Sequence, residues 1–193
     1  MVILAGLLFS SCKTGSKKAV AKEDYVQELK KDASSVISKT IGDITYSLIY
    51  KPLDYMVLTE AKDPTEAEYI ELKKEYSNLE YYTLEIMIKD FNDEILKYRT
   101  PSQEEYAQKV EYYSFGFQKD IFEIIDRDTL PCVSYHFERN YGISPKIRFN
   151  LAFASSASEM DRTVYINNPY LNTGPVKMTF MKKDLNNLPV LKF

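Results

Sequence analysis

The chain has 193 residues, of which 45% are hydrophobic and 27% are charged, as in globular rather than disordered proteins. Its formal net charge of −3 argues against nucleic acid as a partner, because phosphate binding needs a basic surface. A single histidine and six scattered glycines exclude zinc sites that need two histidines and glycine-rich loops that cradle phosphate. We therefore expect no cofactor, no metal site and no catalytic residue.

The chain opens with an uncharged apolar run that ends in Leu8-Phe9-Ser10-Ser11-Cys12 and is followed by Lys13. This run is too short to span a bilayer, which takes about 20 residues. An apolar segment that ends in small residues and then a cysteine resembles the signal of bacterial lipoproteins. The resemblance implies that residues 1–11 are removed as a signal peptide and that the sulfur of Cys12 carries a diacylglycerol.

The same resemblance implies a location in the bacterial cell envelope. In this family an aspartate after the lipidated cysteine retains the protein at the inner membrane, and Lys13 stands there instead. The resemblance thus favours a lipid-anchored protein of the outer membrane that faces the periplasm. Its expected partners are the membrane, through the anchor, and other envelope proteins. Residues 12–24 are polar and basic and predict a flexible tether, and residues 25–193 predict a single β-rich globular domain.

Helical signals fall in the N-terminal part of this domain. Apolar residues recur at near-helical spacing over 25–36 and over 53–57. The stretch Asp63-Pro64-Thr65-Glu66 predicts a helix start, with Asp63 as N-cap and the proline at the first helical position. Ser102-Gln103-Glu104-Glu105 has the spacing of a capping box and predicts another helix start.

Strand signals cover most of the remaining chain. Apolar and polar residues alternate with a period of two, the pattern of a strand with one buried face. The expected strands span 36–41, 44–50, 84–88, 120–125, 130–137, 147–154, 164–166, 176–180 and 188–193. Together these patterns predict an α+β, mainly β fold: an antiparallel β-sandwich, Ig-like in general architecture, with two or three short helices in the N-terminal half.

The second cysteine, Cys132, has no disulfide partner if Cys12 is acylated. Its apolar setting, Leu130-Pro131-Cys132-Val133, predicts a buried thiol. Cys132 and His136 are four apart on one expected strand, so they should share a face at a separation of roughly 13 Å. A nucleophile and its base must lie within hydrogen-bond reach, so this pair does not predict catalysis.

Tyrosine is the most suggestive residue type, with 16 in the chain. Exposed aromatic side chains near turns can stack on sugars or bind peptides. The candidate binding residues are Tyr135, His136, Glu138, Arg139, Tyr141, Tyr165 and Tyr170. The sequence therefore predicts a membrane-anchored envelope lipoprotein with a non-catalytic docking or scaffolding role. The alternative is a glycan- or peptide-binding module that uses exposed tyrosines.

Overall fold

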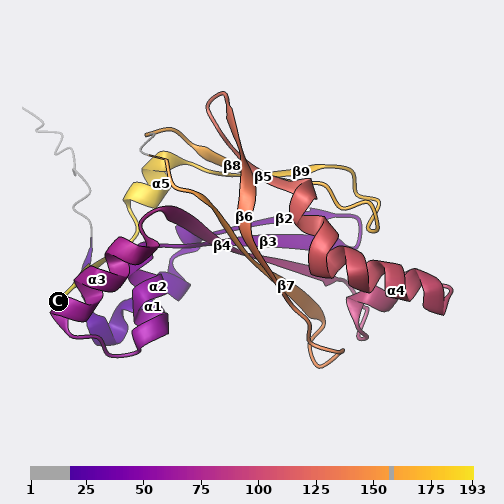
Figure 1. Ribbon diagram of the computed structural model, residues 1–193, viewed down its shortest axis with the longest axis horizontal. Coiled ribbons are helices and arrows are strands. Elements are labelled where there is room, and N and C mark those ends of the chain that lie inside the picture. The colour runs from indigo at the N-terminus through magenta and orange to yellow at the C-terminus, as the bar shows by residue number, and fades with distance from the viewer. Residues whose placement is uncertain (1–17, 157–158) are drawn as a thin grey trace, which may run out of the picture.

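The computed structural model describes residues 18–156 and 159–193 (Figure 1). The predicted signal peptide, 1–11, and the predicted lipidation site, Cys12, lie outside the described residues. Eight strands form one antiparallel sheet in the order β2-β3-β4-β7-β6-β5-β8-β9. In chain order these strands are β2 (Val36–Ile41), β3 (Ile44–Lys51), β4 (Leu79–Ile88), β5 (Ile121–Ile125), β6 (Asp128–Glu138), β7 (Lys146–Ala154), β8 (Arg162–Ile166) and β9 (Val176–Phe180).

Strand β6 joins the two halves of this sheet. Its first part, through Pro131, pairs with β5, and its second part, from Cys132, pairs with β7. A β-bulge between Cys132 and Ser134, near the start of the second part, bends the strand. Strands β2 and β9, at the two ends of the order, contact each other, so the sheet is nearly barrel-like. The predicted α+β, mainly β class is confirmed, whereas the two-sheet sandwich is not, because the strands form one continuous order.

The core lies inside the curved sheet. Alternate residues of each long strand point inward, as the period-2 pattern predicts. On β7, for example, Ile147, Phe149, Leu151 and Phe153 are all buried. Fully burying one such side chain contributes about 1.5–3 kcal/mol, so these rows are the main source of stability.

The part of the chain that the structure describes holds five α-helices: α1 (Lys22–Lys31), α2 (Leu53–Ala61), α3 (Glu66–Tyr76), α4 (Gln103–Glu111) and α5 (Lys182–Asn186). Helix α4 starts as predicted, because Ser102 accepts a hydrogen bond from the backbone of Glu105 at 3.1 Å. The predicted N-cap of α3 is wrong: Thr65, not Asp63, caps this helix. Thr65 forms a capping box with Glu68, whose carboxylate accepts the Thr65 backbone N–H at 2.8 Å.

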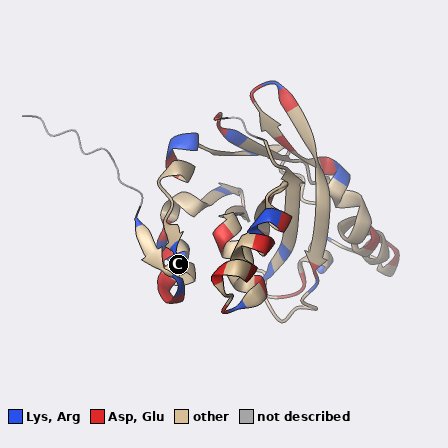
Figure 2. Cartoon of the chain, turned by 60° about the vertical axis from the view of Figure 1, so that its left-hand side comes forward, with Lys and Arg blue, Asp and Glu red and all other residues tan. Residues whose placement is uncertain are grey.

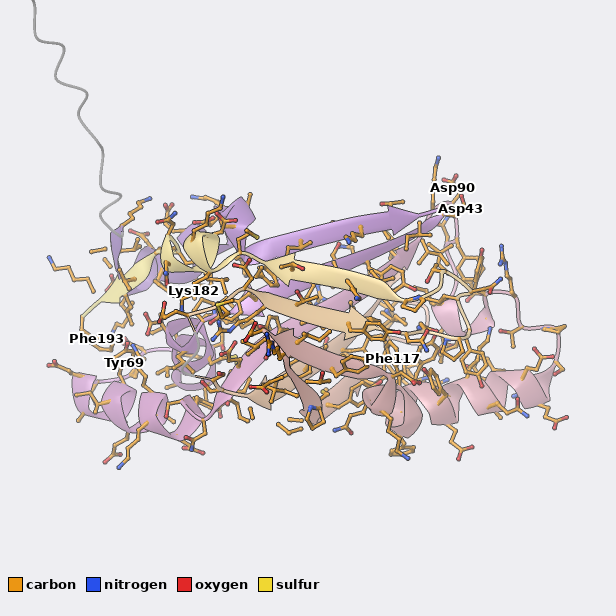
Figure 3. All side chains as sticks on the ribbon, turned by 90° about the horizontal axis from the view of Figure 1, so that it is seen from above. Asp43, Tyr69, Asp90, Phe117, Lys182 and Phe193 are labelled. Atoms are coloured by element: carbon orange, nitrogen blue, oxygen red, sulfur yellow. The ribbon has the colours of Figure 1, made fainter. Side chains whose placement is uncertain are left out.

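The helices gather at two ends of the molecule. Figure 1 shows α1, α2, α3 and the C-terminus at one end and α4 at the other. Figure 3 shows Tyr69 and Phe193 together at the first end, where their ring centroids lie 4.5 Å apart, and Asp43 and Asp90 at the opposite end. None of the described helices combines the length and apolar character needed to cross a membrane.

Both ends of the described chain meet in a small second sheet. Strand β1 (Ala19–Ala21) pairs in parallel with β10 (Val190–Lys192). Two predictions are wrong here. Part of the tether expected over 12–24 is strand and helix, because β1 and the start of α1 lie there. The segment 188–193 pairs with β1 and does not close the main sheet. Val20 and Leu188 are buried in a satellite core, and this burial holds both segments in place.

Candidate functional site

A shallow hollow brings together several of the predicted binding residues. It has a volume of about 530 Å³. We call it the edge hollow; its lining is Ser114, Phe115, Gln118, Tyr135, His136, Phe137, Arg139 and Tyr141. Consecutive residues of a strand point to opposite faces, so a hollow lined by Tyr135, His136 and Phe137 must run along the edge of β6.

The structure separates the other predicted residues from this hollow. Glu138 lines a different cavity of about 310 Å³, on the face of the sheet beside α1 and α2, which we call the sheet-face pocket. Tyr165 stacks on Phe122 with ring centroids 4.3 Å apart. Tyr170 packs edge-on against Tyr112, 5.0 Å away, in a neighbouring shallow hollow. Four of the seven candidates, therefore, share one site.

Tyr141 is held in an unusual backbone conformation. Its φ of 51° lies in the left-handed region, which a bulky residue rarely adopts. The surrounding turn is fixed by Asn140, whose side chain accepts a hydrogen bond from Gly142 N–H at 3.2 Å and donates one to the Ser144 carbonyl at 3.1 Å. The Tyr141 side chain is nevertheless 71% exposed. The turn thus keeps a large aromatic ring in solvent instead of in the core.

The Arg139 guanidinium packs against the face of the Tyr141 ring. It lies 4.4 Å from the centroid of Tyr141, within the range of a cation–π contact. Arg139 Nε donates to Glu94 Oε1 at 3.0 Å, and Nη2 donates to the Tyr106 hydroxyl at 2.5 Å. Tyr106 in turn donates to Glu94 Oε2 at 2.6 Å. The three side chains form a closed triangle, so the position of Arg139 is set before any partner arrives.

Three residues of this site, Glu94, Tyr106 and Phe115, were not predicted from the sequence. Glu94 and Tyr106 are 45 and 33 residues from Arg139, and no local pattern links them. Phe115 is 76% exposed and lines the edge hollow. Its only signal was the aromatic run Tyr112-Tyr113-Ser114-Phe115, which continues α4 as a π-helical turn over Tyr112–Gly116.

Cys132 is buried, as predicted, and its thiol donates to the Ser134 carbonyl at 3.1 Å. Burial raises the pKa of this thiol to about 11, so the reactive thiolate is scarce at neutral pH. The expectation that Cys132 and His136 share a face is wrong. The β-bulge adds one residue between them, so Cys132 lies in the core while His136 is exposed.

The interior also holds a polar cluster that the sequence did not reveal. We define the buried cluster as Glu80, Tyr82, Glu123 and Arg162, all of which are buried. Arg162 donates to both carboxylate oxygens of Glu80, with Nη2 to Oε1 at 2.6 Å. The Tyr82 hydroxyl donates to Glu123 Oε1 at 2.6 Å, while Glu123 Oε2 is buried without a hydrogen-bond partner among the described residues.

Glu123 is the most perturbed carboxyl of this cluster. Burial raises its pKa to about 7, against the opposing effect of the hydrogen bond from Tyr82. No residue of the cluster lines either the edge hollow or the sheet-face pocket. The cluster therefore lies apart from both of these cavities, inside the sheet.

No protein-family model, curated protein or solved structure matches this chain. Within residues 18–156 and 159–193, no group of three or more His, Cys, Asp or Glu side chains is placed to hold a metal ion. The fold and the site thus define a mainly β domain with a curved eight-stranded sheet and an open, aromatic hollow along one strand edge.

Proposed function

We propose that this chain is a non-catalytic docking protein of the bacterial cell envelope, and that its edge hollow receives an extended segment of another envelope protein. The observation that carries the proposal is Tyr141, an exposed aromatic ring in a strained backbone conformation above a fixed arginine. Backbone strain persists only where the surrounding structure enforces it, and such positions cluster at functional sites. Tyrosine and arginine are also the residue types enriched in the energetic centres of protein interfaces.

The strand edge supports an extended partner. Among the described strands, β6 from Cys132 onward pairs with β7 alone, because β5 pairs only with residues up to Pro131. Extended peptides commonly bind by lying along such an edge, with alternate side chains in pockets. The hollow is shallow and open, which suits a chain segment better than an enclosed small molecule.

Lipid anchoring at Cys12 is part of the proposal and is supported by the Leu8-Phe9-Ser10-Ser11-Cys12 stretch. A Cys12→Ser variant should move from the membrane fraction to the soluble fraction of native cells. Cys132→Ser is the matched control and should stay with the membrane. Retention of Cys12→Ser in the membrane fraction would contradict lipid anchoring at Cys12. It would leave the proposal for the docking site unaffected.

Site-specific photo-crosslinking in native cells tests the docking site. A benzophenone amino acid is placed at Phe115 or at His136, inside the edge hollow, and as a control at Tyr165, which stacks on Phe122. We expect one adduct of defined mass from both hollow positions and none from Tyr165. Equal adducts from all three positions, or none from the hollow, would contradict the proposal.

A glycan ligand is the second candidate, favoured by the same exposed Tyr141 ring, because aromatic faces stack on sugars as well as on peptides. Saturable binding of peptidoglycan-derived oligosaccharides that disappears in Tyr141→Ala, without a protein adduct at Phe115, would favour this candidate over a protein partner.

A further inference from the structure

The sheet-face pocket is the more enclosed of the two cavities and lies next to α1 and α2. Its floor is formed by outward-pointing residues of β3, β4 and β7, among them Lys51, Thr83 and Asn150. Its walls come from the end of α1, with Leu29, and from α2, with Tyr55. At about 310 Å³ it falls at the small end of the range for small-molecule sites.

Lys51 is the distinctive group of this pocket. It is half-buried, and its Nζ donates to Asn150 Oδ1, a neutral acceptor, at 3.1 Å. None of the ion pairs among the described residues involves Lys51, whereas its neighbour Arg148 is paired with Glu85 at 2.7 Å. Burial lowers the pKa of Lys51, with Arg148 acting in the same direction and Glu138 against it. A charged group partly removed from water without an ion pair is disfavoured, so an anion in contact with Lys51 would be stabilising.

The polar floor is already ordered around Lys51. Asn150 Oδ1 also accepts a hydrogen bond from Thr83 at 2.9 Å, and Asn150 Nδ2 donates to Glu138 at 2.6 Å. These bonds fix the amide so that its oxygen faces the lysine. A ligand would therefore meet a fixed cation rather than a mobile side chain, which reduces the entropy lost on binding.

The charges around the pocket indicate which anion fits. Lys and Arg residues and Asp and Glu residues are interspersed over the chain, as Figure 2 shows, so a local excess depends on the lining alone. Three cationic side chains line the pocket against two carboxylates, Glu85 and Glu138, which leaves one positive charge in excess. One excess charge matches a monoanion such as a carboxylate better than a phosphate dianion. Leu29, Val36 and Tyr55 provide an apolar wall for the rest of the ligand.

We propose that the sheet-face pocket binds a small organic monocarboxylate with an apolar body. Its carboxylate contacts Lys51, and its body packs against Tyr55 and the end of α1. This site shares no lining residue with the edge hollow, so it stands or falls independently of the docking role.

Isothermal titration calorimetry of the full-length chain in a neutral detergent tests the site. The probes are 3-phenylpropionate, its uncharged amide 3-phenylpropanamide, and inorganic phosphate. The variants are Lys51→Met, which keeps the aliphatic stem but removes the charge, and Lys39→Met, an exposed lysine on β2, as the matched control.

We expect saturable binding of 3-phenylpropionate, at least tenfold weaker binding of the amide, and at least a tenfold loss for the carboxylate in Lys51→Met but not in Lys39→Met. Equal affinity for acid and amide, unchanged affinity in Lys51→Met, or no saturable binding of the acid would overturn the proposal. Phosphate binding more tightly than the carboxylate would overturn the assignment to a monocarboxylate.

Discussion

Two clusters in this protein combine an arginine, a glutamate and a tyrosine, and they differ in what surrounds them. In the buried cluster, the side chains of Arg162 and Glu80 are each 7% exposed. At the edge hollow, Glu94 is similarly buried, but the Arg139 side chain is 25% exposed and carries the Tyr141 ring. The first cluster is enclosed by the sheet, whereas the second presents one side to solvent.

The difference teaches that residue types alone do not identify a site. Removing one partner of a buried ion pair leaves an uncompensated charge in the interior, so the substitution lowers the free energy of unfolding. An ion pair at the rim of a hollow is partly hydrated and contributes little to stability. The pair of Arg139 with Glu94 therefore matters mainly because it positions the Tyr141 ring. We therefore expect changes in the buried cluster to affect folding, and changes at the edge hollow to affect docking.

The largest effect is expected from Arg162→Met. This substitution leaves Glu80 buried without its cation, which should reduce the free energy of unfolding by about 3–5 kcal/mol. Urea denaturation followed by circular dichroism measures the change. Lys97→Met, which breaks the exposed pair with Asp93, is the control and should leave the denaturation midpoint unchanged. A midpoint for Arg162→Met equal to that of the parent chain would remove the contrast between the two clusters.

Glu123→Gln should make the protein more stable in a pH-dependent way. Because the folded-state pKa of Glu123 is raised to about 7 from 4.5, the folded state holds a proton that the unfolded state has lost between these values. The parent chain thus loses stability as the pH rises from about 4.5 to 7, and the amide variant lacks this loss. At pH 8 the variant should be more stable by about 3 kcal/mol, and near pH 4 the two should agree.

Urea denaturation at a series of pH values compares the two proteins. Since Gln keeps an oxygen that can accept the Tyr82 hydroxyl hydrogen bond, the difference reports the charge of Glu123. A stability difference that does not change with pH would contradict a buried, neutral carboxyl at this position.

Arg139→Met is expected to reduce the free energy of unfolding less than Arg162→Met does. It should, however, weaken docking at the edge hollow. The loss of its hydrogen bonds to Glu94 and Tyr106 should lower the free energy of unfolding by about 1–2 kcal/mol. Because the ring of Tyr141 then loses its support, the photo-crosslinked adduct at Phe115 should fall at the same time. A variant with full adduct yield would show that Arg139 does not position the rim.

Much of the fold was predictable because burial imposes a local period. The alternation over 147–154 identified β7, and the strands expected over 36–41 and 44–50 correspond to β2 and β3. Features that depend on distant pairing were not predictable. No local pattern shows that β1 pairs with β10, or that Glu80 contacts Arg162, 82 residues away.

The candidate site was predicted in part for the same reason. Turn tyrosines and their polar neighbours stand next to one another in sequence, so Tyr135, His136, Arg139 and Tyr141 could be grouped in advance. The bulge at Cys132 could not be predicted, because one inserted residue moves the following side chains to the opposite face without changing the composition of the strand. Tyr165 was predicted as a binding residue, but its ring stacks on Phe122 of the neighbouring strand β5. This contact depends on the order of the strands, which the sequence does not show.

The smallest stability effect, and the most direct test of the docking role, is expected from Tyr141→Gly. Glycine adopts the left-handed conformation without strain, so the relieved strain and the lost contact with Arg139 should nearly cancel, leaving stability within about 0.5 kcal/mol. The decisive measurement is the yield of the Phe115 photo-adduct in native cells carrying this variant. We predict at least a tenfold drop in yield at unchanged protein level, and an undiminished yield would contradict the account.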